Sequence, residues 1–144
     1  MYADIEQKII DRLTEKMGPE VHVGPMRDQQ LTQQFQHKAP AVWVIYDGYT
    51  VASTIENAPQ IAQLVQSWIV VISAKSARGN GGEQEARDIA DGMSRKVLGA
   101  LLGFHLGSGK YLRVSDAPGP EYAAGYCDLP LLFTNASTFR GDPN

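Results

Sequence analysis

Apolar residues recur every fourth position at the start of the chain and predict a helix over Tyr2–Met17. Acidic side chains lie early in this segment and basic ones late, an order that suits the helix dipole. Gly18 and Pro19 follow directly and end the helix. The apolar stripe consists of Ile5, Ile9, Leu13 and Met17.

Short runs rich in β-branched and aromatic residues predict five strands. We expect them at Val21–Val23, Ala41–Tyr46, Ile61–Lys75, Tyr111–Ser115 and Tyr126–Thr134. In the long third run, Trp68, Val70 and Ile72 fall on one face, and Ile69 and Val71 fall on the other. Apolar residues on both faces indicate a central strand, or a strand whose second face meets another subunit. Trp43 and Trp68 are expected in the core.

Four segments have weaker patterns. Tyr49–Gln60 is either a long connection or a frayed hairpin, and residues 27–38 are either a polar loop or a short helix. Pro130 cannot donate a ladder hydrogen bond, so the last strand is an edge or carries a bulge there. The chain from Thr138 onward is expected to be mobile.

A second amphipathic helix is predicted from Glu83 to Leu102, and Gly103 ends it. Gly92 and Gly99 inside it each cost about 1 kcal/mol relative to alanine. They indicate either close approach of another element or simple tolerance. The apolar face consists of Ala86, Ile89, Ala90, Met93, Val97, Ala100 and Leu101.

The order of elements, helix, three strands, helix and two strands, predicts an α+β fold. We expect one mixed, mainly antiparallel sheet of about four to five strands with both helices packed on one face. The 144 residues fit a single domain, placed at residues 1–140 with a flexible tail at 141–144.

Composition narrows the class of protein without defining a reaction. A net charge of −3 argues against a dedicated, sequence-specific nucleic-acid binder. The single cysteine, Cys127, cannot form an internal disulfide, so nothing requires an oxidising compartment. The acidic and basic first turn does not resemble a signal peptide, and the apolar run Trp68–Ile72 is far short of the roughly 20 residues that span a bilayer. A cytoplasmic protein without membrane contact is expected.

The glycine-rich segment Gly79–Gly82 lies between a strand and a helix, where backbone N–H groups attract phosphate. It lacks the lysine and the glycine spacing of nucleotide-binding loops, and Glu83 and Glu85 would repel an anion. A connector or an assembly loop is the favoured interpretation, and phosphate or nucleotide binding is the alternative.

No other residues form a recognisable catalytic or metal-binding group. Cys127 has no basic neighbour in sequence and is expected to be a small buried apolar side chain. The three histidines have no ligand spacing. Asp88 and Asp91 are expected on the solvated face of the second helix. We therefore predict no enzyme activity, no cofactor and no metal.

The succession of apolar and glycine-containing segments resembles a known family. Together with the first helix, Ile5–Met17, its landmarks are Gln66–Ile72, Leu98–Gly103, Tyr122–Tyr126 and Leu129–Phe133. In this succession the chain, from about residue 2 to about residue 140, is similar to the small tail-completion proteins of Mu-like long-tailed phages and prophages. Those proteins are in turn similar to the tail terminators of other long-tailed phages.

The resemblance implies a structural role in virion assembly. Such proteins form a ring, commonly a hexamer, that caps the tail tube, stops its polymerisation and offers a head–tail joining surface. The implied partners are other copies of the chain, the tail tube protein and the head–tail connector protein. A neck or head-completion protein of the same virion is the close alternative. The implied location is the virion tail, after assembly in the bacterial cytoplasm.

Interface residues are predicted from their expected place on polar loops and on the tail. The loops Asp47–Gln60 and Ser76–Gly82 suit ring-to-ring contacts. The residues proposed for subunit or partner contact are Tyr49, Arg78, Asn80, Phe139 and Arg140.

Overall fold

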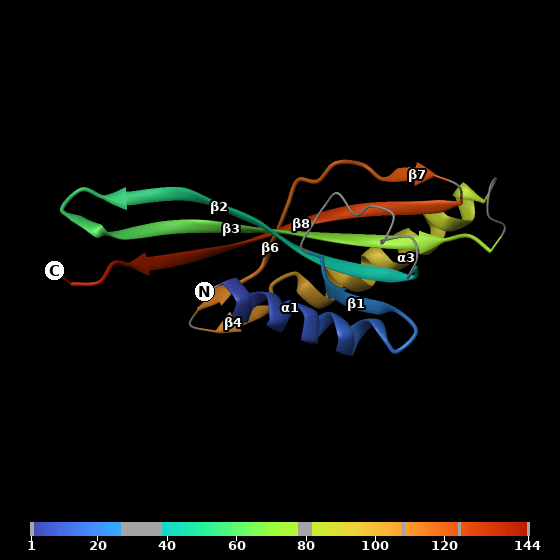
Figure 1. The fold of residues 1–144 in the computed structure, drawn as a ribbon, viewed down its shortest axis with the longest axis horizontal. Coiled ribbons are helices and arrows are strands. Elements are labelled where there is room, and N and C mark those ends of the chain that lie inside the picture. Colours follow the sequence, from blue (N-terminus) through green and yellow to red (C-terminus); the bar gives the residue numbers. More distant parts are fainter. Residues whose placement is uncertain (1, 27–38, 78–81, 108, 124, 144) are drawn as a thin grey trace.

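The computed structural model describes residues 2–26, 39–77, 82–107, 109–123 and 125–143. Within these residues, two helices pack on one face of a long twisted sheet (Figure 1). Residues 27–38, whose loop and helix alternatives the sequence left open, lie outside the described residues, as do Arg78 and Asn80.

The helices form where the apolar periodicity predicts them. They are α1 (Tyr2–Met17) and α3 (Glu83–Leu101). The predicted stripe of α1 is buried, and so is the predicted face of α3 except Ile89, which is exposed. A Cβ on Gly92 or Gly99 would meet nothing within 4 Å, so close approach does not explain these glycines.

Eight strands are present in the described part of the chain, more than the sequence predicted. They are β1 (His22–Pro25), β2 (Ala41–Ile55), β3 (Ala58–Lys75), β4 (His105–Gly107), β5 (Lys110–Tyr111), β6 (Arg113–Ser115), β7 (Glu121–Ala123) and β8 (Tyr126–Arg140). The main sheet has the order β1-β2-β3-β8-β6, with β7 also paired to β8, while β4 and β5 form a separate hairpin. The β1–β2 pairing is parallel and the other pairings are antiparallel. The predicted class, an α+β fold with a mixed, mainly antiparallel sheet, is confirmed.

The main core lies between the helices and the sheet face that carries Trp68, Val70 and Ile72. All three side chains are fully buried, as predicted from their alternation. A smaller cluster on the opposite face contains Trp43 and Val71. Both tryptophans are therefore core residues. β3 is a central strand, with β2 on one side and β8 on the other.

The outer parts of the long strands settle two expectations. Of the two interpretations of Tyr49–Gln60, the structure has the hairpin: the segment is the outer part of β2 and β3, which continue to a turn at Glu56 and Asn57. Thr138–Arg140 is not outside the sheet, because β8 pairs with β3 as far as Arg140. Backbone pairing, interrupted by register shifts between β2 and β3, holds these segments in the sheet although their side chains show little apolar alternation.

Pro130 lies in a long strand without an irregularity in the β3–β8 pairing, so the predicted bulge is absent there. β7 pairs with residues up to Asp128, and β6 pairs from Leu132 onward. Pro130 therefore occupies a gap between two partners on the outer side of β8. At this point the strand is locally an edge, where a missing N–H is tolerated.

Candidate assembly interface

The sheet narrows into a three-stranded projection beyond the helices (Figure 1). β1 pairs with β2 only at residues 41–44, and β6 ends its pairing with β8 at Thr134. Past these points, β2, β3 and β8 are the strands of the main sheet that continue among the described residues. We call this projection the arm: residues 49–55 of β2, 58–66 of β3 and 135–140 of β8.

The base of the arm is fixed by a buried polar chain. The indole Nε1 of Trp68 donates to Asn135 Oδ1 at 2.8 Å, and Asn135 Nδ2 donates to Gln66 Oε1 at 3.0 Å. All three side chains are almost completely buried. Buried amides and indoles orient their neighbours because a lost partner leaves a costly unsatisfied group. These hydrogen-bonded side chains join β3 to β8 at the point where the helices no longer cover the sheet.

One face of the arm carries large exposed apolar side chains. Tyr49, Val51 and Phe139 are 55%, 57% and 52% exposed. Cross-strand pairing places Tyr49 opposite Gln66, Val51 opposite Leu64, and Phe139 opposite Ala62. Directly opposed residues share a face, so all three project on the side of the sheet that faces the helices further along. A large exposed apolar group on one face is typical of an interaction surface.

The structure brings some of the predicted interface residues together and separates others. Tyr49 and Phe139 share the arm face, about 13 Å apart along the strands and about 10 Å across them. Arg140 is exposed and pairs with Ile61, which places it on the other face. None of the three lies on a loop or a free tail.

Arg78 and Asn80 lie outside the described residues, so their place relative to the arm stays a prediction.

Sequence reasoning missed Val51 as an exposed apolar residue of the arm. Tyr49-Thr50-Val51 alternates apolar and polar residues and is followed by Thr54 and Ile55, a composition that favours a strand. The signal was present but too short to separate a strand from a connection.

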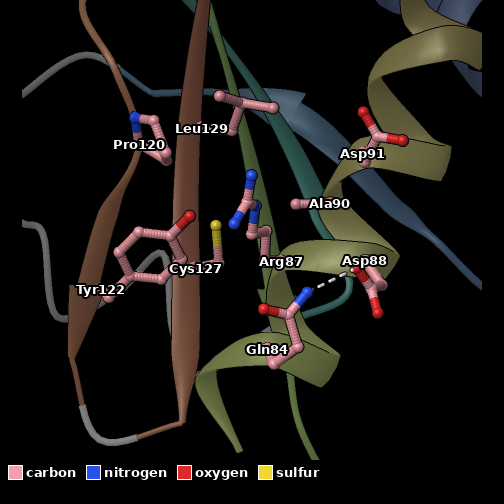
Figure 2. A pocket seen from close by; sticks show the side chains of 9 residues that line it. All are labelled: Gln84, Arg87, Asp88, Ala90, Asp91, Pro120, Tyr122, Cys127 and Leu129. Carbon is pink, nitrogen blue, oxygen red and sulfur yellow. Dashed lines mark hydrogen bonds between the residues drawn. The ribbon is translucent and has the colours of Figure 1, made fainter.

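A separate cavity of about 400 Å³ lies between α3 and the β7–β8 hairpin (Figure 2). Figure 2 shows Arg87 and Gln84 on α3, with Tyr122 and Cys127 across from them. Asp88 and Asp91 are exposed at its rim, where Asp88 accepts from Gln84 at 3.0 Å and Asp91 pairs with Arg95 at 3.4 Å. Their predicted place on the solvated face is confirmed.

Cys127 is a buried free cysteine, as predicted. Burial raises the pKa of its thiol, and the neighbouring Asp128 raises it further, while Tyr122 and Arg87 oppose this rise. A raised pKa keeps the sulfur protonated at neutral pH, where the thiol is a poor nucleophile. Among the described residues, no group of three or more His, Cys, Asp or Glu side chains is placed to hold a metal ion.

Asp128 is the second titratable group with a perturbed environment. Burial raises the pKa of its carboxyl, and Glu121 across the strand pair adds to this, while Ser73 opposes it. Among the described residues, neither Asp128 Oδ1 nor Ser73 Oγ has a hydrogen-bond partner, although the Ser73 hydroxyl is near enough to the carboxyl to lower its pKa. Asp128 and Ser73 are opposed on the sheet face that is remote from the helices.

We expect Asp128→Asn to raise the free energy of unfolding at pH 7 by on the order of 1 kcal/mol, because an amide carries no charge into the buried site and can bond to Ser73. The folded state binds the Asp128 proton more tightly than the unfolded chain. The carboxyl therefore stabilises the fold fully below its ordinary pKa of 3.8, and this contribution is lost as the pH rises through the raised pKa. Urea unfolding at pH 7 and near pH 4 measures the free energy of unfolding of the variant and of the unchanged chain. The stability gained by Asp128→Asn should be smaller at the lower pH. Exposed Asp142→Asn is the control, and a variant destabilised at pH 7 would contradict the prediction.

The described end of the glycine-rich segment does not resemble a phosphate cradle. Gly82 is the N-cap of α3 and provides no side-chain cap, and the first turn carries Glu83 and Glu85. Two carboxylates at a helix N-terminus oppose a bound anion electrostatically. Gly79 to Gly81 lie outside the described residues.

The fold combines an α+β body with a projecting sheet that carries exposed apolar side chains. The chain belongs to the phage tail terminator protein family, whose sequence model matches residues 1–143. The family consists of structural phage tail proteins, so this chain has a structural role in a phage tail and its place is the virion tail. No curated protein matches the chain. Within the described residues, no helix is long and apolar enough to cross a membrane.

Proposed function

We propose that this chain caps the tail tube of a long-tailed phage, stops tube polymerisation and provides the surface that the head joins. It acts as a ring of identical copies, a hexamer in the assembled tail, with the tube protein on one side and the head–tail connector on the other. Assembly takes place in the bacterial cytoplasm. Membership of the tail terminator family supports this proposal.

The observation that carries the proposal is the arm. A three-stranded sheet without a helical layer exposes side chains that would normally be covered, and here they are Tyr49, Val51 and Phe139. A monomeric protein rarely keeps such a group exposed unless another surface covers it. Repetition of one contact around a ring gives strong total binding from modest individual contacts.

A polymerisation assay tests capping directly. Purified chain is added to tube protein from the phage that encodes it, and tube lengths are measured by electron microscopy. We expect shorter tubes with labelled chain at one end only, at a ratio of one ring per tube. Label along the whole tube, or unchanged lengths at molar excess, would contradict capping.

The same assay separates the terminator from a neck or head-completion protein of the virion. A neck protein would leave tube growth unchanged and would bind purified connector instead. For a terminator, we expect binding to finished tube ends first, and connector binding only after the tube is capped.

A further inference from the structure

We propose that copies of this chain join head to tail through their arms, with the free edge of β2 in one copy pairing with the free edge of β8 in the next. This inference rests on the proposed ring and assigns the contact that closes it. The partner is a second copy of the same chain.

Both outer strands of the arm present unpaired backbone. β2 has β3 on one side, and its other side is paired only at residues 41–44. β8 has β3 on one side, and on its other side the described residues pair only at 126–128 and 132–134. Residues 49–55 and 135–140 thus have outward N–H and C=O groups without a strand partner among the described residues, although β5 lies near β8 at Ser137, to which Lys110 Nζ donates at 3.5 Å. Such edges are templates for strand addition.

The two open edges match in direction and in level. β2 and β8 are each antiparallel to β3, so they run parallel to one another. Through β3, Tyr49 lies level with Asn135, Val51 with Ser137, and Thr50 with Ala136. Two arms side by side with their tips aligned therefore place residues 49–51 of one open edge beside residues 135–137 of the other.

The charges on the two edges are complementary. The sequence contains no lysine or arginine between Lys38 and Lys75, and the β2–β3 hairpin carries Asp47 and Glu56. The β8 side carries Arg140 at the tip and Lys110 and Arg113 at the base. None of these five side chains has an ion pair among the described residues.

Two acidic residues reduce the positive charge on the β8 side without reversing it. Asp142 follows Arg140, and Asp4 lines the same hollow as Lys8 and Lys110. At the base of the arm, Asp47 of one copy reaches the level at which β6 of the next begins with Arg113. Opposite charges at this level favour pairing of β2 in one copy with β8 in the next. Like charges disfavour pairing of β2 with β2 or of β8 with β8.

Edge pairing also covers the exposed apolar side chains. Tyr49 and Val51 border the β2 edge, while Phe139 borders the β8 edge on the same face. In the paired arms, Val51 of one copy is a diagonal neighbour of Phe139 in the next, within reach for a large side chain. Within one copy, Tyr49 and Val51 are separated from Phe139 by the width of the arm. Between two paired copies, these side chains form one continuous apolar surface.

The contact uses different surfaces on the two copies, so it can repeat around a ring. β2 is bulged relative to β3 beside Gly48 and Ala52. Bulges limit indiscriminate strand addition at an edge. They restrict the β2 edge to a partner with matching shape and charge.

Cysteine cross-linking tests the pairing in the full chain. Thr50→Cys and Ala136→Cys are exposed and level, and the native Cys127 is buried. The double variant is oxidised on capped tubes and as concentrated free protein. Head-to-tail pairing predicts species at successive multiples of 15.7 kDa that end at a closed ring. Each single variant should give no more than dimers, and Gln84→Cys with Ala136→Cys is the matched control for an unpaired surface.

Charge reversal provides the second readout. Asp47→Arg and Arg113→Asp should each reduce the cross-link yield about fivefold, and both changes in one chain should restore it. Lys96→Asp on the exposed face of α3 should leave the yield unchanged.

The outcomes distinguish this inference from the proposed function. Capped tubes with a cross-linked ladder support both. Capped tubes without a ladder overturn the edge pairing and leave capping intact. A cross-linked ladder in free protein that fails to cap tubes supports the edge pairing and overturns capping. The last two outcomes each overturn one proposal and leave the other standing.

Discussion

Replacing Trp68 by alanine is expected to lower the free energy of unfolding by about 3–5 kcal/mol. The indole is fully buried, packs against Tyr46 at a ring-centroid distance of 4.9 Å and donates to Asn135. Truncation removes this packing and leaves Asn135 Oδ1 without its donor. Two costs therefore add, and the loss is a large part of a typical stability of about 5–15 kcal/mol.

Urea unfolding followed by far-UV circular dichroism measures this loss without relying on tryptophan fluorescence, since the chain has two tryptophans. Trp68→Phe keeps an aromatic ring but removes the N–H donor and part of the indole volume, so we expect a smaller loss of about 1–3 kcal/mol. Exposed Tyr122→Phe is the control and should stay within about 0.5 kcal/mol of the unchanged chain. A loss below about 1 kcal/mol for Trp68→Ala would place the indole outside the core.

The second large effect concerns assembly rather than stability. Combining Tyr49→Ser, Val51→Ser and Phe139→Ser should raise the concentration of chain needed to cap half of the tail tubes at least about tenfold. Each side chain is more than half exposed, so the fold should tolerate the changes. Removal of the apolar group takes away the surface that we propose to be covered in the ring.

A matched triple variant separates loss of apolar surface in general from loss of the arm. Ile89→Ser, Leu102→Ser and Tyr122→Ser change three exposed apolar residues away from the arm. We expect this control to cap tubes normally. Thermal unfolding checks that both triple variants are folded, and normal capping by the arm variant would remove the arm from the assembly surface.

The helices and the central strand were predictable because burial imposes a period on their sequences. In α1 the stripe from Ile5 to Met17 meets the core on every turn, and in β3 alternate residues from Trp68 to Ile72 are fully buried. Where one face of an element is covered and the other is wet, apolar and polar residues must alternate with the geometry of that element. Ile89 was misplaced because it lies at the margin of the buried face of α3.

The arm was not predictable for the same reason. Around Tyr49 and Val51 both faces are largely open to solvent, so no burial pattern distinguishes a strand from a connection. Phe139 seemed to lie on a tail because its partner, Ala62, is remote in sequence. Apolar residues on both faces of β3 had suggested a central strand or a subunit contact, and the sheet order shows the first. The candidate interface could therefore be identified only once the pairing of β8 with β3 was known from the structure.

The pairing of β3 with β8 has a consequence for how this chain reaches its native state. The paired residues are about 50 to 80 positions apart, from Lys75 with Tyr126 to Ile61 with Arg140. Contacts between remote segments form late, so the β2–β3 hairpin is expected to exist before β8 arrives. During that interval the long side of β3 is open to the β8 of another molecule. Slow folding and strand exchange between crowded chains are therefore the expected hazards when this protein is produced at high concentration.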